Sequence, residues 1–165
     1  MPIVRSLGCA AAAAALCALA APAGAALIMR KDLSHDIALT IAEGAIQACL
    51  AKGYGVSAVV VDRDGEILVA MRGDGASIHT LENARRKAYT AMTFKQPTSD
   101  YAKKLNDGNV VVRQQVTLPN VIAIDGGIPI KVGNDVIGGA GASGSPGVDS
   151  DCVNAGIDKV KDQLQ

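Results

Sequence analysis

The two histidines are the side chains of this sequence best suited to binding a transition metal. Neutral imidazole is a common metal ligand. His35 falls in the first turn of an expected helix, where Leu39 and Ala42 share its face, so its ring can lie beside an apolar patch. His79 comes at the entry to a second expected helix. Two other roles stay open, with His35 as a solvated side chain and His79 as part of a helix cap. No His-x-x-x-His or Cys-x-x-Cys pair occurs, so we expect no structural zinc site.

Cationic residues that could hold an anionic ligand occur on the second expected helix and just before it. Arg72 precedes a glycine-containing loop, and Arg86 lies within the run Arg85-Arg86-Lys87. Guanidinium groups bind carboxylates through two parallel hydrogen bonds. A charged run on an exposed helix face is more often simply solvated, and we favour that interpretation for Arg85 and Lys87. Tyr89, three residues after Arg86, could line the same site.

The glycines from Gly139 to Gly144 have the spacing G-x-G-x-x-G between an expected strand and an expected helix. In dinucleotide-binding proteins this spacing brings a pyrophosphate to the helix N-terminus. Here Asp149 and Asp151 crowd that helix start, where their negative charge would repel a phosphate. We therefore expect no nucleotide, and we attribute the glycines to close packing of the strand against another part of the backbone.

No residue pattern indicates a hydrolase. Ser143, in Gly-Ala-Ser-Gly, matches only half of a nucleophile elbow, and no His and Asp partners can be assigned to it. A simpler role for Ser143 is in a cap or turn before Gly144. Asp149 and Asp151 suit a helix N-terminus, because the helix dipole favours negative charge there. Whether the protein is an enzyme stays open at this stage.

Residues 1–25 have the pattern of a secretory signal peptide. Arg5 gives a positive start, an alanine-rich apolar run follows over residues 7–21, and small residues precede a cleavage position after Ala25. The run is too short and too rich in alanine to make a good membrane anchor. We therefore expect a mature chain of residues 26–165 that is exported, to the periplasm or out of the cell, with no stable membrane anchor.

Two cysteines, Cys49 and Cys152, remain in the expected mature chain. An export compartment is oxidising, so a disulfide between them is one prediction. Sequence spacing does not establish that their α-carbons are close enough to be bridged. Two buried free thiols are the other interpretation, and both stay open.

The composition of the mature chain gives no basis for nucleic-acid binding. Of the 16 Lys and Arg residues only Arg5 lies in the signal segment, so 15 basic residues face 16 acidic ones. Such a balanced chain does not attract a polyanion. With no Trp, one Phe and three Tyr, the sequence also lacks aromatic platforms for stacking bases. The remaining length is that of a single domain.

Hydrophobic periodicity and turn signals predict an α+β domain. Two pairs of expected strands are each joined by a tight turn, at residues 63–65 and 133–135. Strands that follow one another as hairpins, rather than alternating with helices, indicate an antiparallel sheet. Between residues 110 and 121 we expect a loop or a short helix. The expected helices span residues 32–52, 77–94, 99–106 and 149–164, and the expected strands span residues 56–62, 66–72, 121–125, 128–132 and 136–142.

The stretch from Gly126 to Gly156 carries a combined pattern: GG-x-PI, an apolar strand into G-x-SG, an acidic turn, and AGI. This pattern resembles the GlcG/HbpS family of haem-binding proteins, and the resemblance continues back to about Asp32. It implies a single domain with a five-stranded antiparallel sheet, helices packed on the sheet, and ring-like homo-oligomers. It also implies haem as the cofactor. The residues that could then serve it are His35 or His79 as the iron ligand, Arg72 and Arg86 as partners of the propionates, and Tyr89 in the pocket wall.

The resemblance implies a protein that binds haem or a related tetrapyrrole and is associated with haem degradation or iron release, and the signal-peptide pattern predicts that this protein is exported. An alternative of another class stays open. The protein would then be a non-catalytic oligomeric accessory or scaffold protein that binds a partner protein or a small organic acid. An iron ligand separates the two hypotheses, because only the first one requires it.

Overall fold

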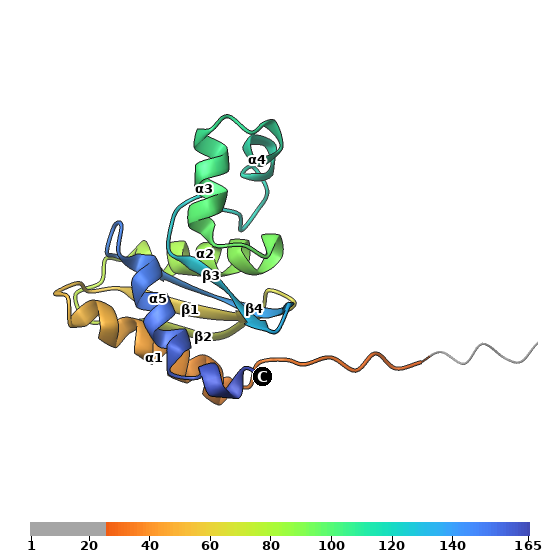
Figure 1. Cartoon of the computed structure of the whole chain (residues 1–165). Coiled ribbons are helices and arrows are strands. Elements are labelled where there is room, and N and C mark those ends of the chain that lie inside the picture. The colour runs from red at the N-terminus through yellow and green to blue at the C-terminus, as the bar shows by residue number, and fades with distance from the viewer. Residues whose placement is uncertain (1–25) are drawn as a thin grey trace, which may run out of the picture. The chain divides into compact units, whose positions relative to one another are not determined.

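Four antiparallel strands, in the order β2-β1-β4-β3, form the centre of the domain (Figure 1). The computed structural model describes residues 26–165, and the compact unit comprises Lys31–Gln165. The predicted signal peptide, residues 1–25, lies outside the described residues. In chain order the elements are α1 (His35–Leu50), β1 (Ser57–Asp62), β2 (Ile67–Arg72), α2 (Thr80–Phe94), α3 (Thr98–Asn106), α4 (Val110–Gln115), β3 (Gly127–Val132), β4 (Asp135–Ser143), α5 (Asp149–Asp158) and a closing 3-10 turn (Lys161–Gln163).

Helices cover both faces of the sheet. Helices α1 and α5 pack on one face and α2 packs on the other (Figure 1). Alternation along β1 supplies both cores, since Ala58 and Val60 join the cluster under α1 and α5, whereas Val59 and Val61 join the cluster under α2. Strand β1 is therefore buried on both sides, which explains why its sequence is an unbroken apolar run rather than an alternating one.

The glycines of β4 let helix α2 approach the sheet closely. A methyl group on Gly139 would lie 2.3 Å from the carbonyl oxygen of Ala88, and one on Gly141 would lie 2.2 Å from that of Ala84. Real side-chain carbons do not come so close to a carbonyl oxygen, so only glycine fits at these two positions. Close packing thus accounts for the G-x-G-x-x-G spacing.

We expect Gly141→Ala to destabilise the domain by about 1–3 kcal/mol, because α2 must move away from β4 to admit the methyl group. Urea unfolding followed by circular dichroism measures the change. Gly53→Asn is the matched control, since nothing lies near that position and asparagine tolerates its positive φ of 84°. Equal stabilities of Gly141→Ala and the parent protein would contradict the packing argument.

Helices α1 and α5 cross at two glycines and are joined by a disulfide. A methyl group on Gly156 would lie 2.3 Å from the carbonyl oxygen of Ile41, and one on Gly44 would lie 2.8 Å from the α-carbon of Gly156. One turn beyond the crossing, Cys49 and Cys152 form a disulfide bond, with their α-carbons 5.4 Å apart. The choice left open between a disulfide and two free thiols is thereby resolved in favour of the disulfide.

The predicted fifth strand, residues 121–125, is wrong. This segment forms no strand in the structure, and the sheet of the described chain has four strands rather than five. The reason is that side chains of α2 take up its backbone groups. The Thr90 hydroxyl accepts a hydrogen bond from the N–H of Ile122 at 2.9 Å, and Arg86 donates to the carbonyl oxygen of Val121 at 2.6 Å. The segment therefore runs beside α2 instead of pairing with β3.

Helices α3 and α4 project from the body of the domain (Figure 1). Tyr101 anchors them, since its ring is buried and stacks on Phe94 with 4.6 Å between ring centroids. Burial raises the pKa of the Tyr101 hydroxyl. The formation of α4 agrees with the expectation of a loop or short helix in this region. Within residues 26–165, no helix has both the length and the apolar character needed to cross a membrane.

Candidate functional site

A pocket of about 380 Å³ lies between the N-terminus of α2 and the loop that joins β4 to α5. Most of its lining residues have polar side chains, and these include both acidic and basic groups. The lining residues are Ser77, His79, Thr80, Asn83, Lys87, Ile124, Asp125, Ser143, Gly144, Pro146, Gly147 and Asp149. We call it the polar pocket. Its volume is within the range of small-molecule binding sites.

The end of the sheet fixes the position of this pocket. Ser57, the first residue of β1, pairs with Ser143, the last residue of β4. The Ser57 hydroxyl shares a hydrogen bond of 2.8 Å with that of Thr80, which holds the first residue of α2 against the sheet. After β4 the chain turns at Gly144, which has a positive φ of 133° and lies close to the backbone of Val56. Both features suit glycine.

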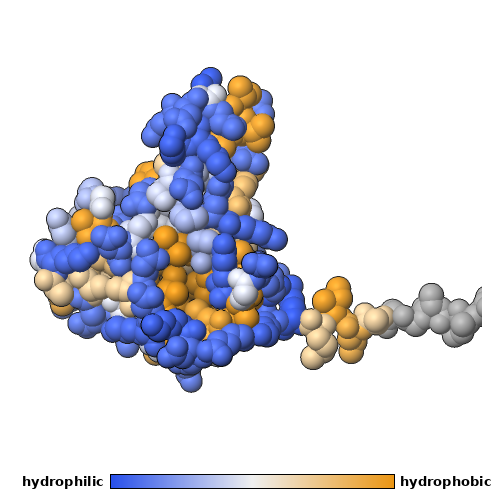
Figure 2. Space-filling model, in the orientation of Figure 1, coloured by the Kyte–Doolittle hydropathy of each residue, from blue (hydrophilic) through white to orange (hydrophobic). Residues whose placement is uncertain are grey.

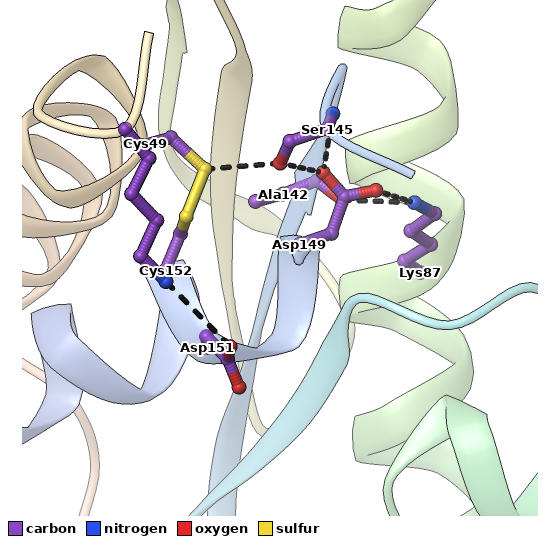
Figure 3. The surroundings of a disulfide bond; sticks show 8 residues. Cys49, Lys87, Ala142, Ser145, Asp149, Asp151 and Cys152 are labelled. Atoms are coloured by element: carbon purple, nitrogen blue, oxygen red, sulfur yellow. Dashed lines mark hydrogen bonds and ion pairs between the residues drawn. A yellow bond between two sulfur atoms is a disulfide. The ribbon is translucent and has the colours of Figure 1, made fainter. Parts of the chain in front are cut away.

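A buried ion pair forms one wall of the polar pocket. The Lys87 ammonium donates to Asp149 Oδ2 at 2.8 Å and to the carbonyl oxygen of Ala142 at 3.0 Å (Figure 3). Lys87 is only 1% exposed and Asp149 only 4%. The other carboxylate oxygen of Asp149 accepts from the N–H and the hydroxyl of Ser145. Both charges are thus compensated, as burial requires.

The solvated position favoured for Lys87 is therefore wrong. Lys87 lies three residues after Ala84 and four before Ala91, and both alanines are fully buried. Residues at this spacing share a helix face, so the alanine stripe was the signal that places Lys87 inside. The sequence reasoning also missed the pairing with Asp149, whose acidic side chain was assigned only to the helix start. Arg85 is half-buried rather than solvated, since its side chain is 26% exposed, pairs with Glu82 and donates to the amide oxygen of Asn120 at 2.9 Å.

The disulfide connects with the ion pair through one serine. Cys49 Sγ lies 3.0 Å from the hydroxyl oxygen of Ser145, which in turn donates to Asp149 at 2.7 Å (Figure 3). Cys49 comes from α1, Ser145 from the loop after β4 and Lys87 from α2. Helices α1, α2 and α5 and the loop after β4 are therefore linked by one continuous set of buried contacts behind the polar pocket.

The structure places His79 at the polar pocket. His79 occupies the N-cap position of α2 but makes no side-chain cap hydrogen bond, so its imidazole is not used to cap the helix. The ring is available to a ligand in the pocket. The other predicted metal ligand, His35, lies near the start of α1, where its side chain is 66% exposed and 3.6 Å from Asp36.

The two histidines lie toward opposite ends of the sheet. Arg63, in the turn between β1 and β2, donates to the carbonyl oxygen of Lys31, which places the start of α1 at the turn end of β1. His79 lies at the other end, beside Ser57. A six-residue strand spans roughly 17–20 Å, so the two rings cannot bind one iron atom within one chain. They stay alternative ligands.

The structure does not gather the remaining predicted site residues around His79. Arg72 lines a second pocket of about 270 Å³ beside the C-terminal end of α1. The guanidinium group of Arg86 donates a hydrogen bond to the carbonyl oxygen of Val121. Tyr89 packs against Gly65 in the turn between β1 and β2, where a methyl group would lie 2.8 Å from its ring. Their roles in binding haem stay predictions.

An apolar groove of about 280 Å³ lies between β2 and the first turns of α2. Ile78 and Ile67 stand out, since they are 85% and 50% exposed. At its edge Glu82 binds Arg85 through two hydrogen bonds of 2.8 Å, and this contact lowers the pKa of the Glu82 carboxyl. The residues that line it are Val59, Ile67, Ala70, Ile78, Leu81, Glu82 and Arg85, and we call it the apolar groove.

In the described part of the chain, a metal ion could be bound only by single side chains, because no cluster of metal ligands is preformed. Among residues 26–165, no three His, Cys, Asp or Glu side chains come together in a group that could hold a metal ion. An iron atom carried by a tetrapyrrole needs only one or two protein ligands, because the ring supplies the others.

Comparison with known proteins identifies the fold and the family. Residues 33–158 match the family model described as haem degrading protein HbpS-like. Protein GlcG of Escherichia coli (strain K12) is 29% identical over 111 residues, which are 67% of this chain and 81% of that protein. The crystal structure of HbpS superposes with a TM-score of 0.77 at 33% identity, over 85% of this chain and 98% of that one.

A further solved structure, described as a PduOC:heme complex, superposes with a TM-score of 0.72 at 25% identity and covers 78% of this chain and 94% of that one. The GlcG/HbpS resemblance inferred from the sequence is thereby confirmed. The chain belongs to the family of HbpS-like haem degrading proteins.

Proposed function

We propose that this protein binds haem, with the iron ligated by His79 at the N-terminus of α2. One observation carries the proposal. The consecutive residues Ile78 and His79 line two different surfaces, the apolar groove and the polar pocket. A haem has the same two requirements, since its ring needs an apolar surface and its iron needs a ligand such as imidazole.

The residues around His79 fit a haem. The imidazole of His79 is free of a cap hydrogen bond, and Ile78, Leu81 and Ile67 offer aliphatic surface next to it. His79 would hold the iron and the aliphatic side chains would contact the ring. When bound, the iron would supply the redox chemistry from which haem degradation and iron release follow. We assign no catalytic residue of the chain itself.

The comparisons support the choice of ligand. The family is described by haem degradation, and one solved structure of the same fold is described as a heme complex. Both statements concern other proteins. They agree with the local chemistry around His79, and they favour haem over a partner protein as the ligand of this chain.

We further propose that the mature chain begins at Ala26 and works outside the cytoplasm. The pattern of residues 1–25 supports export. The disulfide between Cys49 and Cys152 supports it independently, because such bonds persist in oxidising compartments. Mass spectrometry of the protein from a periplasmic or culture fraction would identify the first residue.

A homo-oligomer is the proposed working form. Val110, Val111 and Leu118 around α4 are all more than half exposed, and Figure 2 shows apolar side chains gathered over this projecting part. These side chains leave an aliphatic surface, separate from the apolar groove, for a second copy to cover. Light scattering after gel filtration, with and without hemin, would determine the number of chains.

We expect His79→Ala to reduce hemin affinity at least about tenfold, because it removes the iron ligand. The measurement is an absorbance titration of residues 26–165 with hemin, followed at the Soret band. His35→Ala is the matched control, since it removes an exposed imidazole at the other end of the sheet and should bind like the parent protein. A titration that does not saturate, or that His79→Ala leaves unchanged, would contradict the proposal.

A further inference from the structure

We propose that the polar pocket is a binding site for a carboxylate group, held by Ser143, Lys87 and the N-terminus of α2. These three groups are hydrogen-bond donors that come from different elements and line one pocket. Each has donor capacity that the described chain does not use. Together they match the two acceptor oxygens of an ionised carboxylate.

Ser143 provides the first observation. It is 5% exposed, yet its hydroxyl has no hydrogen-bond partner among residues 26–165, and it lines the polar pocket. Ser143 is paired with Ser57 across the sheet, so both side chains lie on the same face. The Ser57 hydroxyl contacts Thr80 of α2, and the Ser143 hydroxyl is therefore directed to the α2 side as well. The Ser143 residue lines the pocket and its hydroxyl has no partner in the described chain, so a ligand bound there can accept a hydrogen bond from it.

Lys87 provides the second donor. Its ammonium group has three N–H bonds, and the described contacts with Asp149 and with the carbonyl oxygen of Ala142 use two of them. The amine is held in place by those contacts, so little conformational entropy is lost when the third N–H meets a ligand. Lys87 also contributes the positive charge that balances Asp149.

The N-terminus of α2 provides the third donor. This helix has 15 residues, and its N-cap residue His79 makes no side-chain hydrogen bond to the first turn. The N–H of Thr80 donates to the carbonyl oxygen of Ser77 at 3.1 Å, so the helix contributes the N–H groups of its next two residues, which have no partner within the helix, and its dipole, which makes this end attractive to anions. A carboxylate at this position would occupy the place that a capping side chain fills elsewhere.

Two acidic side chains, Asp149 and Asp125, also line the pocket, and an uncompensated negative charge there would repel an anionic ligand. Both carboxylate oxygens of Asp149 are occupied, by Lys87 and by Ser145, so its charge is compensated. Asp125 accepts a hydrogen bond from Ser150 but has no cation beside it among the described contacts. The charge of Asp125 should therefore weaken anion binding without preventing it, and removing this charge should strengthen the binding.

The carboxylate could belong to a free small organic acid or to a propionate of haem. The chemistry that the pocket recognises is the same, and only the second source rests on the proposed haem function. Propionate is therefore the probe, because it represents both sources, and propionamide is its neutral isostere. Binding is followed by chemical-shift changes in ¹⁵N-labelled protein, residues 26–165.

We expect saturable shifts with propionate at the backbone of Ser143 and of the first turn of α2, and at least about tenfold weaker binding of propionamide. Ser143→Ala should weaken propionate binding about tenfold, since a hydrogen bond to a charged group is lost. Ser99→Ala is the control, because Ser99 is exposed on α3. Equal binding of acid and amide, or no effect of Ser143→Ala in a protein with unchanged spectra elsewhere, would overturn the proposal.

Asp125→Asn should have the opposite effect. The amide oxygen can still accept from Ser150, while the negative charge disappears, so propionate should bind about threefold or more tightly. Unchanged or weaker binding would contradict an anion site at this position.

A competition experiment distinguishes the two sources of the carboxylate. If propionate displaces hemin in the absorbance titration, the pocket takes a haem propionate. If both bind together, the pocket takes a separate small acid. Hemin binding through His79 without any propionate binding would overturn this inference alone, whereas propionate binding without hemin binding would overturn the proposed function alone.

Discussion

Asp149→Ala is expected to destabilise the domain by about 3–5 kcal/mol, one of the two largest effects of a substitution in this chain. The variant leaves the Lys87 ammonium buried with only the carbonyl oxygen of Ala142 as a partner. Removing one member of a buried ion pair leaves an uncompensated charge, which costs far more than losing an exposed pair. It also removes the acceptor for the N–H and the hydroxyl of Ser145. Urea unfolding of parent and variant measures the difference.

Two controls make this result specific. Asp107→Ala breaks the exposed pair of Asp107 with Lys103 and should change stability little, because solvent screens that contact. The double variant Lys87→Met, Asp149→Ala removes both charges and should recover much of the lost stability. A single Asp149→Ala variant as stable as the Asp107→Ala variant would show that the pair is not buried as described.

Removing the disulfide is expected to cost a comparable amount, about 2–5 kcal/mol. The bond joins residues 103 positions apart, and a loop of this length loses much conformational entropy in the unfolded chain. The variant Cys49→Ala, Cys152→Ala tests this through the midpoint of urea unfolding. Its loss should include the contact of Cys49 with Ser145, which supports the ion pair behind the polar pocket.

A reducing agent provides the matched control for the disulfide. It should lower the unfolding midpoint of the parent protein toward that of the double variant and leave the double variant unchanged. A parent protein whose midpoint does not respond to reductant, after the free thiols have been shown to form, would contradict the stabilising role of this bond.

The sequence was sufficient for the local elements. Helix α1, expected over residues 32–52, begins after Ser34, because the Ser34 hydroxyl accepts from the N–H of Ile37. The two hairpins were predicted from their turns, and both form. Caps and tight turns depend on residues three or four positions apart, so a local pattern contains what determines them.

The errors came from partners that are distant in the sequence. Residues 121–125 look like a strand, but their backbone groups bind Thr90 and Arg86, more than 30 positions earlier. Lys87 looks like part of a solvated charge run, but its partner Asp149 is 62 positions away. No local pattern shows such a pairing, and only the three-dimensional arrangement brings the groups together.

The candidate site was predicted in part for the same reason. The sequence identified His79 as a chemically capable side chain, and the structure places it on a pocket. The structure separates it from His35 and does not gather Arg72, Arg86 and Tyr89 around it. The sequence drew attention to Ser143 only as half of a nucleophile elbow and to Lys87 only as part of a charge run. Their role as hydrogen-bond donors in the pocket follows from their burial and their partners, which a sequence does not show.

The most direct test of the haem proposal is a rescue experiment with imidazole. His79→Gly removes the ligand while glycine remains acceptable at an N-cap. We expect the hemin complex of His79→Gly to lose the Soret spectrum of the parent protein and to regain it when free imidazole is added, whereas His35→Gly should match the parent protein without imidazole. A His79→Gly complex that has the parent spectrum and affinity before any imidazole is added would contradict ligation by His79.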